Sequence, residues 1–582
     1  MARTSGSRIT IDIPNETPLP HGPQGSRLEV IDYDGGHGRF YPPINPNDEA
    51  VLMEGGLQPT ESDPRFHQQM VYGAAMKTLE NFDRALGRRL EFKRPNKYSR
   101  LRLFPHAFHG ANAFYSHDLN AVLFGYFKAS TLDPGSNLPG QTVFTCLSHD
   151  VIAHEMSHAL VDRLRRYFLE PSNGDVLAFH EGFADIVALF QHFSFEQIVR
   201  EEIQKTRTDL RQPGLLVDLA QQFGHATGLN RALRSAVGNK ELRLTEEVTE
   251  PHKRGSILVA AVFDGFFDTY QRRIRDLIRI ATGGTGNLPA GDLHPDLISR
   301  IASESAQTAQ SILTMCIRAF DYLPPVDIRY GDYLRALVTA DYELAPADQF
   351  GQRQAIVEAF RQRGIFPDHV ASLAEESLLW EPPEKPLRLP FDTVEMLREL
   401  AFAATSFGSP ADPLEESLVM QTFSLSDEGT QLDISADMAL QLAAFADDNK
   451  ADLFLDPSSK IEVHGFHPVF RVGPDGQLSV ELVAMFAQHT DMAGLGGIPF
   501  RGGTTLVASA DGRVRYLITK PLPSTLLPPE QASQAKERLD RQLEYISLCD
   551  AADPQVAFSN EAYLQNRMRL RMDIAAMHMG LT

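Results

Sequence analysis

The stretch from residue 148 to 168 constrains this fold more than any other part of the chain. We expect a helix here, because either Ser148 or Asp150 can cap its first turn. Apolar side chains occupy nearly every side of the helix, which indicates that it is buried. The segment HEMSH, residues 154–158, nevertheless places a glutamate and two histidines within it. Buried polar groups need a partner that offsets their lost hydration, and a metal ion would be such a partner.

The HEMSH segment places two imidazoles on one face of the helix. Because His154 and His158 are four residues apart, both rings can bind one ion, with Glu155 beside it. A catalytic zinc ion takes three protein ligands and keeps one position for water. Glu181, at the start of the next expected helix, fits the third place, and Asp185 on the same face could orient a ligand histidine. Zinc lowers the pKa of its bound water to roughly 7, and Glu155 would take the proton.

These residues, in this order, resemble the thermolysin-like gluzincins, metallopeptidases that combine HExxH with a downstream glutamate. DVIAHEMSHALVD resembles the active-site helix of that family, and HEGFADIVALF resembles the helix of its third ligand. The resemblance implies one zinc ion held by His154, His158 and Glu181, with Glu155 as the catalytic base. Asp185 matches the family's aspartate that supports a ligand histidine.

Three further segments extend the resemblance to substrate binding. NAFY resembles the edge strand that pairs with substrate backbone, which gives Asn112 and Ala113 a substrate-binding role. HKRGSILVAAVF resembles the segment of the transition-state histidine, so His252 would donate to the oxyanion. ALRSAVG resembles the segment of an arginine that contacts a substrate carbonyl, which makes Arg234 the candidate, with two other arginines as rivals.

The resemblance covers residues 69–367 approximately and implies an α+β fold with two lobes. A mixed β/α N-lobe, 69–168, would end in the HExxH helix, and a helical C-lobe, 169–367, would follow. Structural calcium, which secreted relatives bind, is not evident here, because His192 and Phe193 occupy the corresponding stretch.

The segments on either side lie outside the resemblance. Residues 1–68 are rich in Pro, Gly and Asn and are expected to form an N-terminal extension. After Trp380 a proline-rich linker precedes alternating apolar runs and an amphipathic helix, so we expect residues 385–582 to form a separate accessory α+β domain. Its role stays open between substrate recruitment, oligomerisation and intramolecular inhibition, and the oligomeric state is unknown.

Composition narrows the partners and the location. The net charge of −21 gives an acidic surface that repels phosphate backbones, which argues against nucleic acid. Cys146, Cys316 and Cys549 lie far apart and form no CxxC pair, which argues against a disulfide framework and against a thiolate metal site. We see no signal peptide or membrane-spanning run. We therefore expect a cytoplasmic protein without a membrane partner, or one exported without a cleaved signal.

The function that these observations predict is zinc-dependent, endopeptidase-type hydrolysis of peptide bonds in a peptide or protein substrate. One alternative is a gluzincin aminopeptidase, which carries a GxMEN-type strand. The nearest string here, GAAMKTLEN at 73–81, has a helical pattern and lies far from His154. Another alternative is a zinc-binding scaffold that acts through its C-terminal domain without catalysis. The presence of both Glu155 and His252 favours catalysis over that alternative.

Overall fold

The computed structural model describes residues 9–551 except 17–18, 93–98, 133, 135–136, 194, 209–241, 246–247, 289–290, 396–432, 473–477 and 496–497, and it also describes residue 574. Its helices and strands form a mixed α+β fold, as the sequence predicts. None of the helices in this part of the chain combines the length and the apolar character needed to cross a membrane.

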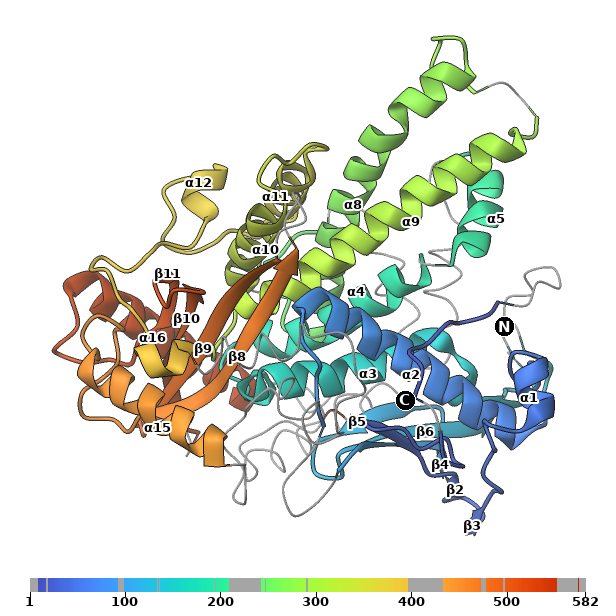
Figure 1. Cartoon of the computed structure of the whole chain (residues 1–582), viewed down its shortest axis with the longest axis horizontal. Helices are drawn as coiled ribbons and strands as arrows, with labels where there is room; N and C mark the ends of the chain where they lie inside the picture. Colours follow the sequence, from blue (N-terminus) through green and yellow to red (C-terminus); the bar gives the residue numbers. More distant parts are fainter. Residues whose placement is uncertain are drawn as a thin grey trace.

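A mixed five-stranded sheet forms the N-terminal part of the molecule (Figure 1). β4 pairs in parallel with β1 on one side and with β6 on the other, whereas β5 and β7 run antiparallel to β6. Because β5 ends the strand order β1-β4-β6-β5, it is an edge strand. The strands are β1 (Leu28–Val30), β4 (Leu101–His109), β5 (Ala113–Ser116), β6 (Ala121–Lys128) and β7 (Thr142–Phe144).

The segment 1–68 is more than an extension, because it supplies a strand of this sheet. β1 pairs with Leu101 to Leu103 of β4, and the side chains of Leu28 and Val30 are buried there. This strand has only three residues and lies among prolines and glycines, so the sequence contains no alternating pattern that would predict it. The same segment holds the two-stranded sheet of β2 (Tyr33–Asp34) and β3 (Arg39–Phe40) and the short helix α1 (Glu49–Met53).

A helical layer packs against this sheet and carries most of the main hydrophobic core. α3 (His149–Leu164) lies between α2 and α4. Ser148, one of the two expected capping residues, is its N-cap, because the Ser148 hydroxyl accepts from the Val151 N–H at 3.4 Å. The remaining helices are α2 (Pro64–Leu86), α4 (Gly174–His192), α5 (Glu196–Thr206), α8 (Pro251–Ala281), α9 (Pro295–Arg318), α10 (Tyr330–Leu344), α11 (Gln352–Gln362) and α12 (Glu375–Leu378), with 3-10 turns η1 (Thr145–Leu147), η2 (Arg166–Leu169) and η3 (Ala319–Tyr322).

The C-terminal part is built on an antiparallel four-stranded sheet in the order β11-β10-β9-β8. The residues between β8 and β9, 473–477, lie outside the described part of the chain, and an ADG turn, residues 510–512, joins β10 to β11. The elements are α15 (Asp433–Asp448), β8 (Glu462–Val472), β9 (Leu478–Thr490), β10 (Phe500–Ser509), β11 (Val514–Lys520) and α16 (Pro529–Ala551).

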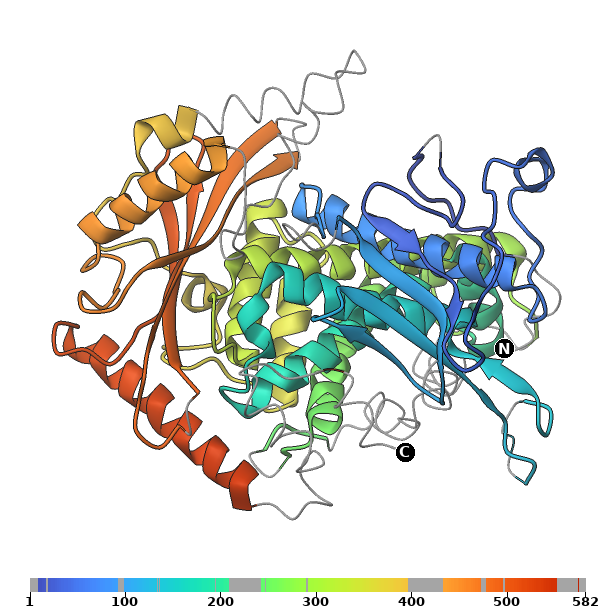
Figure 2. The same cartoon turned by 90° about the horizontal axis from the view of Figure 1, so that it is seen from below.

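This second sheet is buried on both faces, so its packing differs from the separate domain that the sequence predicts. Along β9, Val483 and Met485 join the main hydrophobic core, which the helical layer also supplies. The alternating residues Leu482, Ala484 and Phe486 belong to a second core, which also includes residues of α15. Figure 2 shows the curled sheet between α15 and the central helices. The C-terminal sheet therefore completes the core of the helical layer.

A buried ion cluster joins the two parts. The carboxylate of Asp321 in η3 accepts from both terminal guanidinium nitrogens of Arg88, two residues after the end of α2, at 2.8 and 2.7 Å. It also lies 3.1 Å from Nε2 of His467 in β8. Burial acts to raise the pKa of Asp321, but Arg88 and His467 lower it far below its usual value. All three side chains are at most 3% exposed, so this cluster links the segment after α2 to η3 and β8 away from solvent.

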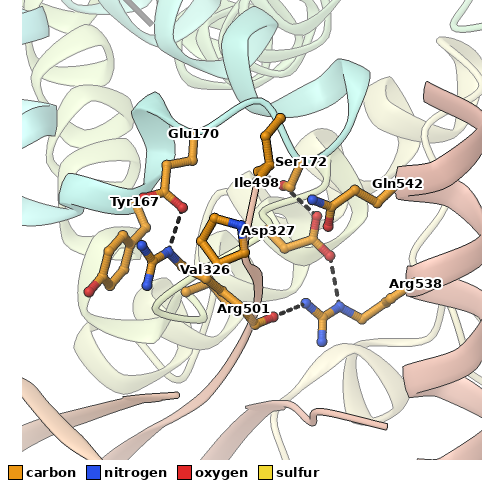
Figure 3. Close-up of a pocket in the computed structure, with 10 residues that line it drawn as sticks. Tyr167, Glu170, Ser172, Val326, Asp327, Ile498, Arg501, Arg538 and Gln542 are labelled. Atoms are coloured by element: carbon orange, nitrogen blue, oxygen red, sulfur yellow. Dashed lines mark hydrogen bonds and ion pairs between the residues drawn. The ribbon is translucent and has the colours of Figure 1, made fainter. Parts of the chain in front are cut away.

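A second set of contacts fastens α16 and β10 to the helical layer around a small pocket (Figure 3). The guanidinium of Arg501 donates to Glu170 at 2.5 Å, and that of Arg538 donates to Asp327 at 2.7 Å. Arg538 also donates to the carbonyl oxygen of Arg501 at 2.8 Å. Because these charges are paired with one another, we interpret the pocket as part of an interface within the chain.

Candidate metal centre

Three buried side chains from two neighbouring helices converge on one point. His154 and His158 come from α3 and Glu181 comes from α4, and each is at most 1% exposed. One ligand atom from each residue lies within 4.8 Å of the other two. The structure therefore brings together the three residues that the sequence predicts as metal ligands.

The spacing of these atoms fits a tetrahedral ion. Nε2 of His154 lies 3.0 Å from Nε2 of His158 and 3.4 Å from Oε2 of Glu181. Nε2 of His158 lies 3.6 Å from Oε1 of Glu181. Ligand bonds of roughly 2.0–2.1 Å would place tetrahedral ligands about 3.3 Å apart. Two imidazoles and a carboxylate at this spacing could hold a metal ion.

Two neighbours fix the orientation of the imidazoles. Nδ1 of His154 lies 2.9 Å from Oδ1 of Asp185, which keeps a proton on Nδ1 and turns Nε2 toward Glu181. Nδ1 of His158 lies 3.1 Å from Nδ1 of His180. Burial lowers the pKa of His180 to about 4, so this ring is neutral and its Nδ1 can accept a hydrogen bond from the Nδ1–H of His158. Sequence reasoning assigns no role to His180, whereas the structure makes it the orienting partner of a ligand.

The electrostatics of the site favour a cation. Burial acts to lower the pKa of His154, but the contacts with Asp185 and Glu181 raise it to about 10. A histidine shifted in this direction shows that the surrounding carboxylates stabilise positive charge. A metal ion between the same groups would receive that stabilisation.

Glu155 is held beside the ligands by the edge strand. Its Oε2 accepts from the backbone N–H of Tyr115 at 2.9 Å. The phenol of Tyr115 donates to Asp162, one turn after His158, at 2.7 Å. Strand β5 is thus attached to α3 at two points, and the carboxylate of Glu155, which is fully buried, has a defined position.

His252 also lies at this site, as predicted. It is the second residue of α8, and the N-cap Glu250 accepts from its backbone N–H at 3.0 Å. Its Nδ1 lies 3.2 Å from Oε2 of Glu181. His252 is 8% exposed, which places it at the margin of the buried ligand set.

The distance between α4 and α8 is set by two glycines that sequence reasoning missed. A Cβ atom on Gly182 would lie 2.7 Å from the carbonyl oxygen of Gly255, and one on Gly255 would lie 2.9 Å from the carbonyl of Ala178. The helices therefore touch backbone to backbone, next to Glu181 and one turn after His252. A pair of glycines so far apart in the sequence gives no local signal of this contact.

Replacing Gly255 with Ala is expected to force α8 away from α4. The added methyl group has no flexible neighbour that could yield, because the atoms it meets are backbone. Overpacking of this kind costs about 1–3 kcal/mol of stability. Chemical denaturation should detect this loss, and Gly73→Ala in α2, where a Cβ meets nothing within 4 Å, is the matched control. Equal stability of the two variants would contradict the close crossing.

The structure places two of the three residues that the sequence predicts to bind substrate, and their role stays a prediction. Ala113 is the first residue of β5, as expected of the edge strand. The side chain of Asn112 accepts from the N–H of Ala113 at 2.8 Å, so here it caps its own strand. Arg234 lies outside the described residues. At His192, where secreted relatives would have calcium ligands, the structure places the ring Nδ1 3.3 Å from Oδ1 of Asp150.

No protein-family model and no curated protein matches this chain. The resemblance to thermolysin-like gluzincins therefore rests on the residues quoted above and stays a prediction.

Proposed function

We propose that this protein hydrolyses peptide bonds with a zinc ion held by His154, His158 and Glu181. The observation that carries the proposal is the convergence of these two imidazoles and one carboxylate, whose nearest polar atoms lie 3.0–3.6 Å apart, with the carboxylate of Glu155 fixed beside them. Two imidazoles and one carboxylate are a typical donor set for catalytic zinc. Zinc, when bound, lowers the pKa of a water molecule to roughly 7 and polarises a carbonyl group.

Glu155 would act as the catalytic base. The Tyr115 N–H binds one oxygen of its carboxylate and keeps the side chain in place. The carboxylate would take a proton from the attacking water and pass it to the leaving amine, which is the usual course of general acid–base catalysis.

The edge strand supports a peptide as the substrate. In an antiparallel strand, the N–H and C=O of one residue face the same side. The Tyr115 N–H points away from β6, toward Glu155, so the carbonyl of Tyr115 faces that side too. An extended peptide could pair with the carbonyls along this side of β5, as in strand addition to other sheets. The proposed unit is two-lobed and thermolysin-like, with the sheet on one side of the metal and α4 and α8 on the other.

Neither alternative function gains support. The string GAAMKTLEN at 73–81 lies inside α2, so it does not form the strand that an aminopeptidase would need. A scaffold without catalysis would not need Glu155 held beside the ligands.

The proposal is tested by measuring the zinc content and the peptide cleavage of the purified chain. We expect the wild-type protein to cleave a mixed peptide library, and we expect cleavage to stop when a chelator removes the metal. His154→Ala should lose one zinc per chain together with cleavage. A variant that keeps all of its zinc would show that His154 is not a ligand, and a zinc-loaded wild type that cleaves no peptide would contradict the hydrolase assignment.

Replacing His252 with Ala is expected to lower kcat about a hundredfold while the zinc remains. Nδ1 of His252 faces Glu181, and its Nε2 would donate to the oxyanion of the tetrahedral intermediate. Loss of one such donor costs about 10²–10³ in kcat. His489→Ala, at an exposed position on β9, is the control and should retain full activity. Loss of zinc from the His252 variant would instead make this residue a ligand.

A further inference from the structure

The fold brings a cysteine and two histidines together at a second buried point. His67 belongs to α2, His106 to β4 and Cys146 to η1, and one ligand atom from each lies within 4.8 Å of the other two. Their exposed fractions are 1%, 2% and 0%. The wide spacing of the cysteines argues against a thiolate metal site, but the donors here are one cysteine and two histidines from distant segments.

The geometry of the imidazoles resembles that of the first site. Nδ1 of His106 lies 2.6 Å from Oδ1 of Asp32, and Asp32 is held in turn by Gln68, whose amide nitrogen donates to Oδ2 at 2.7 Å. Nε2 of His106 lies 2.8 Å from Nδ1 of His67. The pattern is the same as for Asp185, His154 and His158, where a carboxylate binds one nitrogen and a second imidazole meets the other.

The surroundings of this cluster are dry and aromatic. The ring of Phe144 lies 4.7 Å from that of His67 and 5.4 Å from that of His106, measured between centroids. Tyr41 packs edge-on against His106 at 5.1 Å. Such a shell keeps bulk water away and leaves the thiol and the two imidazoles as the protein donors, so that a single water molecule would be the fourth ligand of a tetrahedral ion. A thiolate with two imidazoles suits zinc or another thiophilic cation, and does not suit calcium or magnesium.

We propose that His67, His106 and Cys146 form a second metal centre, which takes zinc and has a structural role. A bound ion would tie together α2, β4 and η1, and Asp32 would link the same point to the N-terminal segment. η1 ends at Leu147, directly before α3, so this centre would also hold the start of the helix that carries His154. The energy of binding a structural zinc ion contributes to folding.

The alternative is a hydrogen-bonded chain from Asp32 through His106 to His67, with Cys146 as an apolar neighbour. The metal centre and the hydrogen-bonded chain differ in whether the sulfur of Cys146 bonds to a metal ion. A thiolate bound to cobalt(II) gives an intense near-ultraviolet charge-transfer band, which nitrogen and oxygen ligands do not give. Because the first site has no sulfur ligand, its cobalt would not contribute to this band.

The experiment replaces the metal of the full chain with cobalt(II) and records the absorption spectrum. We expect about two cobalt ions per chain and a thiolate band in wild type. Cys146→Ser should lose the band and one equivalent of cobalt, whereas Cys316→Ser, at a buried cysteine in α9, should keep both. His154→Ala should keep the band and lose the other equivalent, so failure of the proposed function and failure of this centre are separate results.

Two outcomes would overturn the second centre. One is a cobalt-loaded wild type without a thiolate band. This test also holds where Cys146→Ser does not fold. The other is a band that persists in folded Cys146→Ser, since the sulfur would then come from another cysteine.

Discussion

Replacing Glu155 with Gln is expected to lower kcat about a thousandfold or more, with the zinc retained. Glutamine has nearly the shape of glutamate, and its amide oxygen can still accept from the Tyr115 N–H that positions the side chain. What it lacks is the ability to take a proton, and general-base catalysis contributes typically 10²–10⁴ in rate. The loss should therefore be in turnover and not in metal binding or folding.

The measurement pairs cleavage of a peptide library with the zinc content and the melting temperature of each variant. The control is Glu196→Gln, which makes the same replacement of a carboxylate by an amide at an exposed glutamate of α5. This variant should retain full activity. Equal cleavage by the Glu155 variant would remove this residue as the base. Cleavage lost together with zinc would make Glu155 part of the metal site.

Replacing Asp321 with Asn is expected to cost about 3–5 kcal/mol of unfolding free energy, which is the usual cost of removing one partner from a buried ion pair. Asparagine fills the same space but leaves the guanidinium of Arg88 buried without its counter-charge. It also weakens the contact with His467 of the second sheet. The variant should unfold at a lower denaturant concentration in one transition, because the sheet shares the main core.

Denaturation followed by two probes, one for helix content and one for tertiary packing, checks this expectation. Asp296→Asn, at a carboxylate with a 92% exposed side chain, is the control and should change stability by less than about 1 kcal/mol. A separate early transition of the C-terminal part alone would contradict the shared core. A loss as small as that of the control would show that Asp321 is not a buried counter-charge.

Local patterns predicted the central helices well. Ser148 caps α3 and the expected ligands on α3 and α4 meet, because capping residues and helical spacing are properties of short segments. Contacts between distant segments were not predictable in this way. β1 pairs with β4, and β9 packs against two cores. Both contacts depend on partners that are distant in the sequence and that no local pattern identifies.

The same limit explains why sequence reasoning missed residues at both candidate metal sites. His180 has no local signature, and it acquires a role only because α4 brings it against His158. Cys146 gains two imidazole neighbours only when α2 and β4 are in place. Spacing rules recognise ligands supplied by one short segment, so a centre assembled from three segments escapes them.

The backbone contact between Gly182 and Gly255 has a consequence for protein engineering. It fixes the separation of α4 and α8 next to Glu181 and His252, because no side chain lies between the helices there that could be trimmed or enlarged. Under the function that we propose, selection for bulkier substrates should therefore leave α4 and α8 unchanged near this crossing. It should instead enrich changes in β5 and in the link from Tyr115 to Asp162, where side chains make the contact with α3.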